Sequence, residues 1–409
     1  MKWTLVDSSG LEDILVSLAE GRDVFALKSL DNGSYSLTQT SAWDSERHTL
    51  GAYRQTEPLK ALFFPAREFI GRWPGLPAAD SLAVPMPEPT PQQVTESASE
   101  SALEAESTPG LQPAGAPVPA IRAESGPTSG QTPKPMRERI VFGVKNCDLS
   151  SLSIFDYVFL HGVCADPYYA EARERTILVS TDCSSHLEVC FCPAVGEQPW
   201  AEAGFDINIS DTPDGYVIED GSARGAQLLE SVQQHLEPAD VALLEVLAQQ
   251  RLRHQRELVE HCESHGLKPG TDLRAAVEGS FESGLWQDFA TDCVECGACN
   301  FICCTCHCFL LADGEDEYGV PARSKLWDAC LYSAFARTAG GGNPRPLRAE
   351  RLRNRFDKKF SFFPQVLGRY ACDGCGRCTE ACIAQIDIRN VLRRAVDECD
   401  AIHAHSRND

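Results

Sequence analysis

The chain has 409 residues, of which 43% are hydrophobic, and its 37 basic and 59 acidic side chains give a net charge of −22. This length allows two or three domains of about 150 residues each. The surplus of acid argues against nucleic acid as a partner, because phosphate binding relies on Lys and Arg. No stretch reaches the roughly 18 apolar residues that cross a bilayer, and the N-terminus lacks a signal-peptide pattern, so we expect a cytoplasmic protein.

The first segment, residues 1–73, predicts part of an α/β domain. Residues 12–19 form a short amphipathic stretch, and residues 23–27 have the composition of a strand. Asp31-Asn32-Gly33 then predicts a turn into another strand.

Residues 74–136 differ in composition from the rest of the chain. They hold 13 of the 25 prolines and no aromatic residue. Such a segment buries too little apolar area to offset its chain entropy, so it predicts a disordered Pro/Ala/Ser-rich insertion. Nothing in it indicates a function.

A βαβ unit with parallel strands follows the insertion. Residues 140–144 and 176–180 predict buried strands, and residues 148–160 predict the helix between them. A hairpin over residues 205–219 completes an α/β domain of residues 1–73 and 137–221, and residues 222–290 predict a helical connector.

The 19 cysteines carry the strongest signal, since a chain without an export signal more often uses them for metal than for disulfides. Two runs repeat the ferredoxin pattern of C-x2-C-x2-C-x3-C. In two-cluster ferredoxins the fourth cysteine of each run ligates the other cluster. The spacing therefore assigns one [4Fe-4S] cluster to Cys293, Cys296, Cys299 and Cys382, and a second to Cys372, Cys375, Cys378 and Cys303.

Two zinc sites are the alternative to two clusters, but zinc does not need the third cysteine of each run. The proline that usually follows the fourth cysteine is replaced by Cys304 and by Ile383. The long chain between the runs predicts helices over residues 324–337 and 347–359. We therefore expect residues 291–400 to form a mostly α-helical dicluster domain of the ferredoxin type.

Further cysteines surround the first run. Cys304, Cys306, Cys308 and Cys330 are predicted to pack beside a cluster, because the two runs already supply all eight thiolates; ligation of a cluster or a further metal is the alternative. The isolated Cys164, Cys262 and Cys399 are predicted to be buried structural thiols.

A third group of cysteines belongs to the α/β domain. Cys147 and Cys183 each follow a predicted parallel strand, so both lie at the carboxyl edge of the sheet, where open α/β sheets bind ligands. Cys190 and Cys192 follow in the next loop. These four favour a third [4Fe-4S] cluster, with a zinc site or a group of free thiols as alternatives.

A basic segment lies between the two runs in this acidic chain. Its members are Arg345, Arg348, Arg351, Arg353, Arg355, Lys358 and Lys359. They predict either a solvated helix face or cations that stabilise anionic clusters and form a docking patch, and their position between the runs favours the second interpretation.

Several motifs resemble a known family of iron–sulfur proteins, typified by the sulfhydrogenase beta subunit together with its counterpart in anaerobic sulfite reductase. The matching residues are 58–65 (PLKALFFP), 143–149 (GVKNCDL), 166–169 (DPYY), 190–192 (CFC), the first run with Thr305-Cys306-His307-Cys308, 326–330 (LWDAC) and 372–378 (CDGCGRC). That family usually has proline at the position of Cys304. The resemblance implies an electron relay between the flavin/nicotinamide subunit of a complex and its terminal catalytic subunit, in an anaerobe.

No nucleotide-binding or hydrolase motif accompanies the cysteines. The sequence therefore predicts an electron-transfer subunit that is not catalytic alone. The alternatives are a reductase subunit with a substrate-binding cluster near Cys303, Cys304 and Cys306, and a zinc-dependent scaffold.

Overall fold

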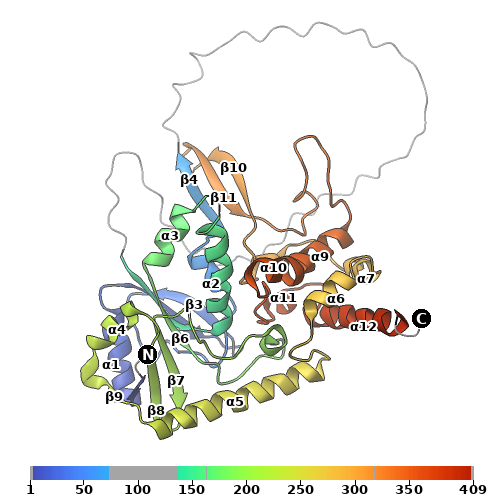
Figure 1. Cartoon of the computed structure of the whole chain (residues 1–409). Helices are drawn as coiled ribbons and strands as arrows, with labels where there is room; N and C mark the ends of the chain where they lie inside the picture. Colours follow the sequence, from blue (N-terminus) through green and yellow to red (C-terminus); the bar gives the residue numbers. More distant parts are fainter. Residues whose placement is uncertain (1–2, 73–136, 163, 317, 407–409) are drawn as a thin grey trace, which may run out of the picture.

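The computed structural model describes residues 3–72, 137–162, 164–316 and 318–406 (Figure 1). The insertion expected over residues 74–136 lies outside these described residues. No helix among the described residues is long and apolar enough to cross a membrane.

An eight-stranded mixed sheet organises the N-terminal half, in the order β3-β2-β5-β6-β7-β8-β1-β9. Strands β2, β5, β6 and β7 are parallel, and antiparallel strands complete both sides. The strands are β1 (Trp3–Val6), β2 (Asp23–Ser29), β3 (Tyr35–Thr40), β5 (Arg139–Val144), β6 (Thr176–Thr181), β7 (Ile207–Thr212), β8 (Gly215–Asp220) and β9 (Glu237–Pro238).

Every residue of β5 and β6 is buried, as expected for central parallel strands covered on both faces. Ile140 and Phe142 pack with helix α1 (Ser8–Ala19) on one face. Val141 packs on the other face with helix α2 (Asn146–Phe159) and helix α3 (Pro167–Glu174). The predicted βαβ unit is confirmed.

The predicted hairpin is confirmed as β7 and β8, which turn between Thr212 and Gly215. Gly215 has a φ of +133°, and a Cβ at this position would lie 2.6 Å from the carbonyl oxygen of Val6. Only glycine therefore allows β1 to approach the turn this closely.

Helices predominate between the hairpin and the first cysteine run, as predicted. They are α4 (Ala223–Glu230), α5 (Val241–Ser264), α6 (Leu273–Gly279) and α7 (Leu285–Thr291). Asp240 caps α5 by accepting a hydrogen bond from the Leu243 amide at 2.7 Å. α5 extends from the sheet towards the C-terminal helices, and α6 and α7 pack on them (Figure 1).

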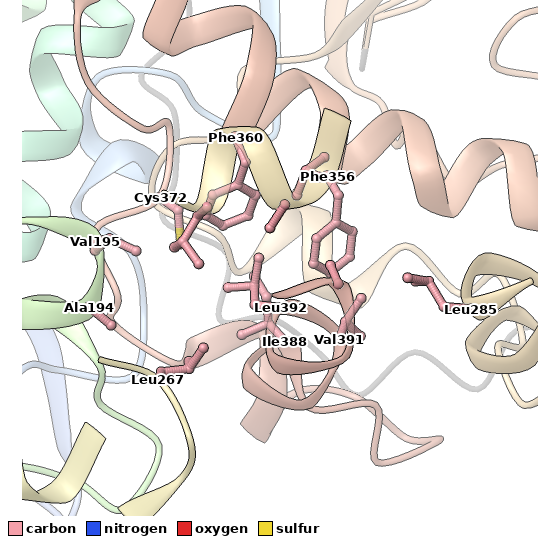
Figure 2. Packing of buried hydrophobic residues seen from close by; sticks show 14 of the residues in the cluster. Ala194, Val195, Leu267, Leu285, Phe356, Phe360, Cys372, Ile388, Val391 and Leu392 are labelled. Carbon is pink, nitrogen blue, oxygen red and sulfur yellow. The ribbon is translucent and has the colours of Figure 1, made fainter. Parts of the chain in front are cut away.

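The C-terminal half contains α8 (Ala298–Phe301), α9 (Arg348–Asp357), a π-helical turn (Lys358–Phe362), α10 (Phe363–Leu367), α11 (Arg377–Glu380) and α12 (Ile388–Ser406). The predicted helix over 347–359 corresponds to α9 and the start of the π-helical turn. Figure 2 shows its core, in which Phe356 and Phe360 pack near Val391 and Leu392 of α12. Cys372 lies at the edge of this apolar cluster.

A second, three-stranded sheet has the order β10-β11-β4, with β4 (Arg67–Arg72), β10 (Phe309–Glu315) and β11 (Pro321–Trp327). The predicted helix over 324–337 is wrong, because residues 324–327 belong to β11 and turns follow. β11 pairs along its length with β10 and with β4, a partner from far earlier in the chain. These pairings override the local helical pattern.

Glu219 of β8 gives the sheet a pH dependence. Burial raises its pKa from 4.5 to about 7, so the unfolding free energy falls as pH rises from about 4.5 to 7. We expect Glu219→Gln to stabilise the protein by about 1–3 kcal/mol near pH 8 and less near pH 5.5. Anaerobic urea unfolding at both pH values measures this, with the exposed Glu237→Gln as control. An equal gain at both pH values would contradict the assignment.

Candidate metal centres formed by cysteine thiols

The first group of thiols, site A, comprises Cys293, Cys296, Cys299 and Cys382. All four line one cavity, together with Cys378 and with apolar side chains that include Leu352 and Phe356. Cys382 comes from the second run and follows α11, whereas the other three lie in the loop before α8 and in α8 itself. The structure thus brings together the four residues that the spacing grouped.

The second group, site B, comprises Cys303, Cys372, Cys375 and Cys378. Cys372 and Cys378 lie close enough to Cys303 for its thiolate to raise the pKa of both, although burial is the larger cause. The thiolate of Cys375 also contributes to the raised pKa of Cys378. Cys303 therefore joins the second run, as the spacing predicted.

The third group, site C, comprises Cys147, Cys183, Cys190 and Cys192. Cys147 begins α2, Cys183 follows β6, and the other two lie in the loop that enters a short 3-10 helix (Cys192–Val195). Burial raises the pKa of Cys183 to about 11, with a contribution from Cys190. Burial, then the Asp148 carboxylate and more weakly the thiolates of Cys375 and Cys183, raise the pKa of Cys147. Burial and the neighbouring thiolates raise the pKa of Cys192. The four residues meet at the sheet edge, as predicted.

Site C adjoins site B through two loops in direct contact. The amide of Phe191 donates to the carbonyl of Gly374 at 2.7 Å. A Cβ on Gly374 would lie 2.4 Å from the Cys192 backbone, and one on Gly376 would lie 2.2 Å from the Val189 carbonyl oxygen. The φ angle is +64° at Gly374 and +70° at Gly376. The CDGCGRC loop can therefore pack this closely only with glycine at both positions.

Comparison with known proteins agrees with this arrangement. A family model described as a 4Fe-4S dicluster domain matches residues 292–386. Over 253 residues the chain is 31% identical to sulfhydrogenase 2 subunit beta of Pyrococcus furiosus, covering 62% of this chain and 72% of that protein. The chain belongs to the sulfhydrogenase beta subunit family. It is therefore an iron–sulfur electron-transfer subunit of an oxidoreductase.

Three buried cations show whether the thiols of this sulfhydrogenase beta subunit relative suit iron–sulfur clusters. Lys60, Arg355 and Lys359 are buried, and none has a carboxylate ion-pair partner within the described ranges. Lys359 Nζ lies 3.3 Å from Cys303 Sγ, and Arg355 Nη1 lies 3.3 Å from Cys306 Sγ. Buried cations need nearby negative charge, which thiolates supply. The residues thus fit anionic thiolate-ligated [4Fe-4S] clusters.

The electrostatics of Arg355 and Lys359 follow the same pattern, whereas burial lowers the pKa of Lys60. Burial alone would lower the pKa of Arg355, yet the thiolates of Cys299, Cys306 and Cys303 hold that pKa well above its usual value. Lys359 behaves likewise, because Cys303 and Cys306 outweigh its burial and raise its pKa. Both side chains therefore stay charged beside the thiols.

The basic segment thus divides between two environments. Arg351, Arg355 and Lys359 are spaced four residues apart and form one buried stripe. Arg353 is half-buried, lies 3.8 Å from the centre of the Phe281 ring and donates to the Phe281 carbonyl at 2.8 Å. Arg355 and Lys359 lie beside thiols, as the second interpretation predicted, whereas Arg351 pairs with the Glu295 carboxylate.

The additional cysteines surround sites A and B. Cys304 Sγ lies 3.3 Å from Asp373 Oδ2 and 3.8 Å from Cys375 Sγ. Cys330 Sγ accepts a hydrogen bond from Asn300 Nδ2 at 3.1 Å. Cys308 lies 4.0 Å from Lys358 Nζ. Their role as packed thiols rather than ligands stays a prediction. Cys262 is buried near Cys190 and Cys192 of site C, and Cys399 is buried away from the sites. Cys164 is exposed, so the prediction of a buried structural thiol is wrong there.

Several residues that contact the thiol sites were not predicted from the sequence to do so. Arg377 Nη2 forms a buried ion pair with Asp148 Oδ2 at 2.6 Å, and Arg54 Nε donates to the Cys375 carbonyl at 2.6 Å. Lys60 Nζ donates to the Cys306 carbonyl at 3.0 Å. Lys60, Asp148 and Arg377 fall within the family motifs, which was the available signal. Arg54 had none.

We expect Gly374→Ala to disrupt the contact between sites B and C. The added Cβ overlaps the Cys192 backbone, so the variant should lose iron and unfold at a lower temperature. Gly368→Ala is the matched control, because Gly368 has a φ of +69° but no atom within 4 Å of its Cβ position. Its cost is only the roughly 1–2 kcal/mol of a left-handed non-glycine residue. Equal iron content and melting temperature in the two variants would show that the contact is unimportant.

We expect Lys359→Gln to lower the reduction potential of the cluster proposed at site B. Removing a positive charge beside Cys303 disfavours the added electron, and a change of about 1–2 kcal/mol corresponds to about 40–90 mV for one electron. Anaerobic redox titration followed by EPR measures the shift. Arg353→Gln, from the same segment but at a half-buried residue that contacts no thiol within the described ranges, should leave every potential within about 10 mV. A shift of the same size in both variants would contradict a local effect.

Proposed function

We propose that the chain relays electrons between the flavin/nicotinamide subunit of a cytoplasmic anaerobic oxidoreductase complex and its terminal catalytic subunit. Three [4Fe-4S] clusters held at sites A, B and C would supply the one-electron chemistry. The ligands are those named for each site. The observation that carries the proposal is that the three sites adjoin one another in a row.

Site B takes the middle position in that row. On one side, Cys378 of site B lies close enough to Cys299 of site A for its thiolate to raise the pKa of Cys299, where burial is the larger cause. On the other side, the thiolate of Cys375 contributes to the raised pKa of Cys147 and Cys190, again after burial. This order supports a relay, because it leaves one site at each end for a partner.

The two ends differ in their surroundings. Near site A, the apolar Val294 and Ile383 are 61% and 76% exposed, which suits contact with another protein. Near site C, a cavity of about 640 Å³ opens at the sheet edge and is lined by Cys183, Trp200 and Arg251 among others. These features support one partner at each end.

The second candidate function, a reductase subunit with a substrate-binding cluster, has less support. It places a substrate near Cys303, Cys304 and Cys306. Cys303 and Cys304 are only 6% and 1% exposed, and Cys304 is enclosed by Asp373 and Cys375. A substrate would need to displace packed side chains to reach them. Their burial favours electron transfer over direct substrate reduction.

Iron and acid-labile sulfide per chain test the proposal on anaerobically purified protein. We expect about twelve irons, falling to about eight in Cys183→Ser, with EPR signals from the other two clusters retained. Cys164→Ser, at an exposed isolated cysteine, should keep about twelve. About eight irons in the unaltered protein would contradict the third cluster, and zinc without iron would contradict the relay.

A further inference from the structure

A group of histidines lies beside site C and takes no part in the relay. His254, His261 and His265 are on α5 or at its end, and His186 and Glu188 are in the loop between Cys183 and Cys190. His261 and His265 are one helical turn apart and so share a face of α5. One ligand atom from each of Glu188, His261 and His265 lies within 4.8 Å of the other two.

Backbone hydrogen bonds fix which nitrogen of each ring is free. His261 Nε2 lies 2.7 Å from the Glu188 carbonyl oxygen, and His265 Nδ1 lies 2.9 Å from the His261 carbonyl oxygen. Because a carbonyl only accepts, each of these nitrogens carries a proton and donates. The free positions are His261 Nδ1 and His265 Nε2. Metal-binding histidines commonly donate their second nitrogen in this way.

Both free nitrogens face the same carboxylate. His265 Nε2 lies 2.9 Å from Glu188 Oε1, and His261 Nδ1 lies 4.0 Å from Glu188 Oε2. A second proton, on His265 Nε2, would explain the 2.9 Å contact with Glu188 but not the contact of His261. It leaves the lone pair of His261 facing a carboxylate oxygen, which is also an acceptor. A cation bound between the three groups satisfies all of them.

We propose that Glu188, His261 and His265 form a zinc site, separate from the three thiol sites. Two imidazole nitrogens and one carboxylate oxygen are ligands that zinc accepts, and water can complete a tetrahedron. The Glu188 side chain is 74% exposed, so solvent reaches the open position.

The surroundings permit a cation at this position. Arg389 donates to the Glu188 carbonyl at 2.6 Å, and its guanidinium pairs with Asp387 at 2.7 Å and, more distantly, with Glu188 Oε1 at 3.9 Å. The closer pair with Asp387 offsets the positive charge of this guanidinium, so the longer contact with Glu188 leaves that carboxylate available to a second cation. His186 and His254 bond to each other at 3.4 Å, and His254 also bonds to the Cys183 carbonyl at 2.7 Å, so they act as supports rather than ligands.

The zinc site would join the loop of residues 183–192 to α5. That loop carries three cysteines of site C, so a bound zinc ion holds the loop in place from outside the thiols. Because zinc would bind only the folded arrangement, it should also raise the melting temperature of the protein.

The test measures zinc and iron together by mass spectrometry on anaerobic protein that retains its clusters, after equilibration with zinc sulfate and removal of loose metal. We expect one zinc per chain. His261→Gln and His265→Gln should lose this zinc and its thermal stabilisation while keeping their iron. His235→Gln and the exposed His161→Gln are controls that should keep the zinc.

X-ray absorption at the zinc edge of the unaltered protein keeps the test independent of how the variants fold. We expect nitrogen and oxygen neighbours at about 2.0–2.1 Å with imidazole scattering. A shell of sulfur at about 2.3 Å would place zinc at the thiols and overturn the proposal. Absence of zinc from the unaltered protein, or its retention in both ligand variants, would overturn it equally.

Discussion

The buried ion pair between Asp148 and Arg377 joins the two halves of the molecule where sites B and C meet. The side chain of Asp148 is 0% exposed and follows Cys147 of site C, whereas that of Arg377 is 1% exposed and precedes Cys378 of site B. Asp148 also accepts hydrogen bonds from the Leu59 amide and the Gln55 side chain. Breaking such a pair by removing one partner typically costs about 3–5 kcal/mol, because the other charge stays buried. This ion pair is the most deeply buried of the contacts that hold the sheet against the cysteine runs, beside those of Arg54 and Phe191.

Charge balance explains much of the remaining architecture. Packing many thiolates into a protein interior is unfavourable unless cations accompany them. The chain supplies those cations from several directions: Lys60 comes from the N-terminal segment, and Arg355 and Lys359 come from α9 and the π-helical turn after it. The π-helical turn places Lys359 so that it also donates to the Ala371 carbonyl beside Cys372. An acidic protein thus concentrates buried positive charge where its thiols gather.

The loop of residues 183–192 has two different faces. One face contacts the CDGCGRC loop through backbone atoms and glycines, with no room for side chains between them. The other face contacts α5 through histidines and Glu188. This loop therefore transmits the position of α5 to the cysteines of site C, which gives the proposed zinc ion a structural role near a proposed redox centre.

The sequence by itself determined the elements and groupings that depend on local pattern. The repeated cysteine spacing predicted that Cys382 would join the first run and Cys303 the second, and the side chains do meet in this way. The buried strands on either side of α2 predicted the sheet edge at which Cys147 and Cys183 lie. Spacing and periodicity succeed here because the constraint acts over a few residues or one supersecondary unit.

Only the tertiary structure decided the features that join distant segments. β11 pairs with β4 from the far N-terminal part of the chain, so the local pattern wrongly predicted a helix at residues 324–327. The pairing of Asp148 with Arg377, the contact of Arg54 with Cys375, and the meeting of Glu188 with His261 and His265 have the same origin. Side chains far apart in sequence leave no periodic signal, because their proximity depends on how the whole chain packs.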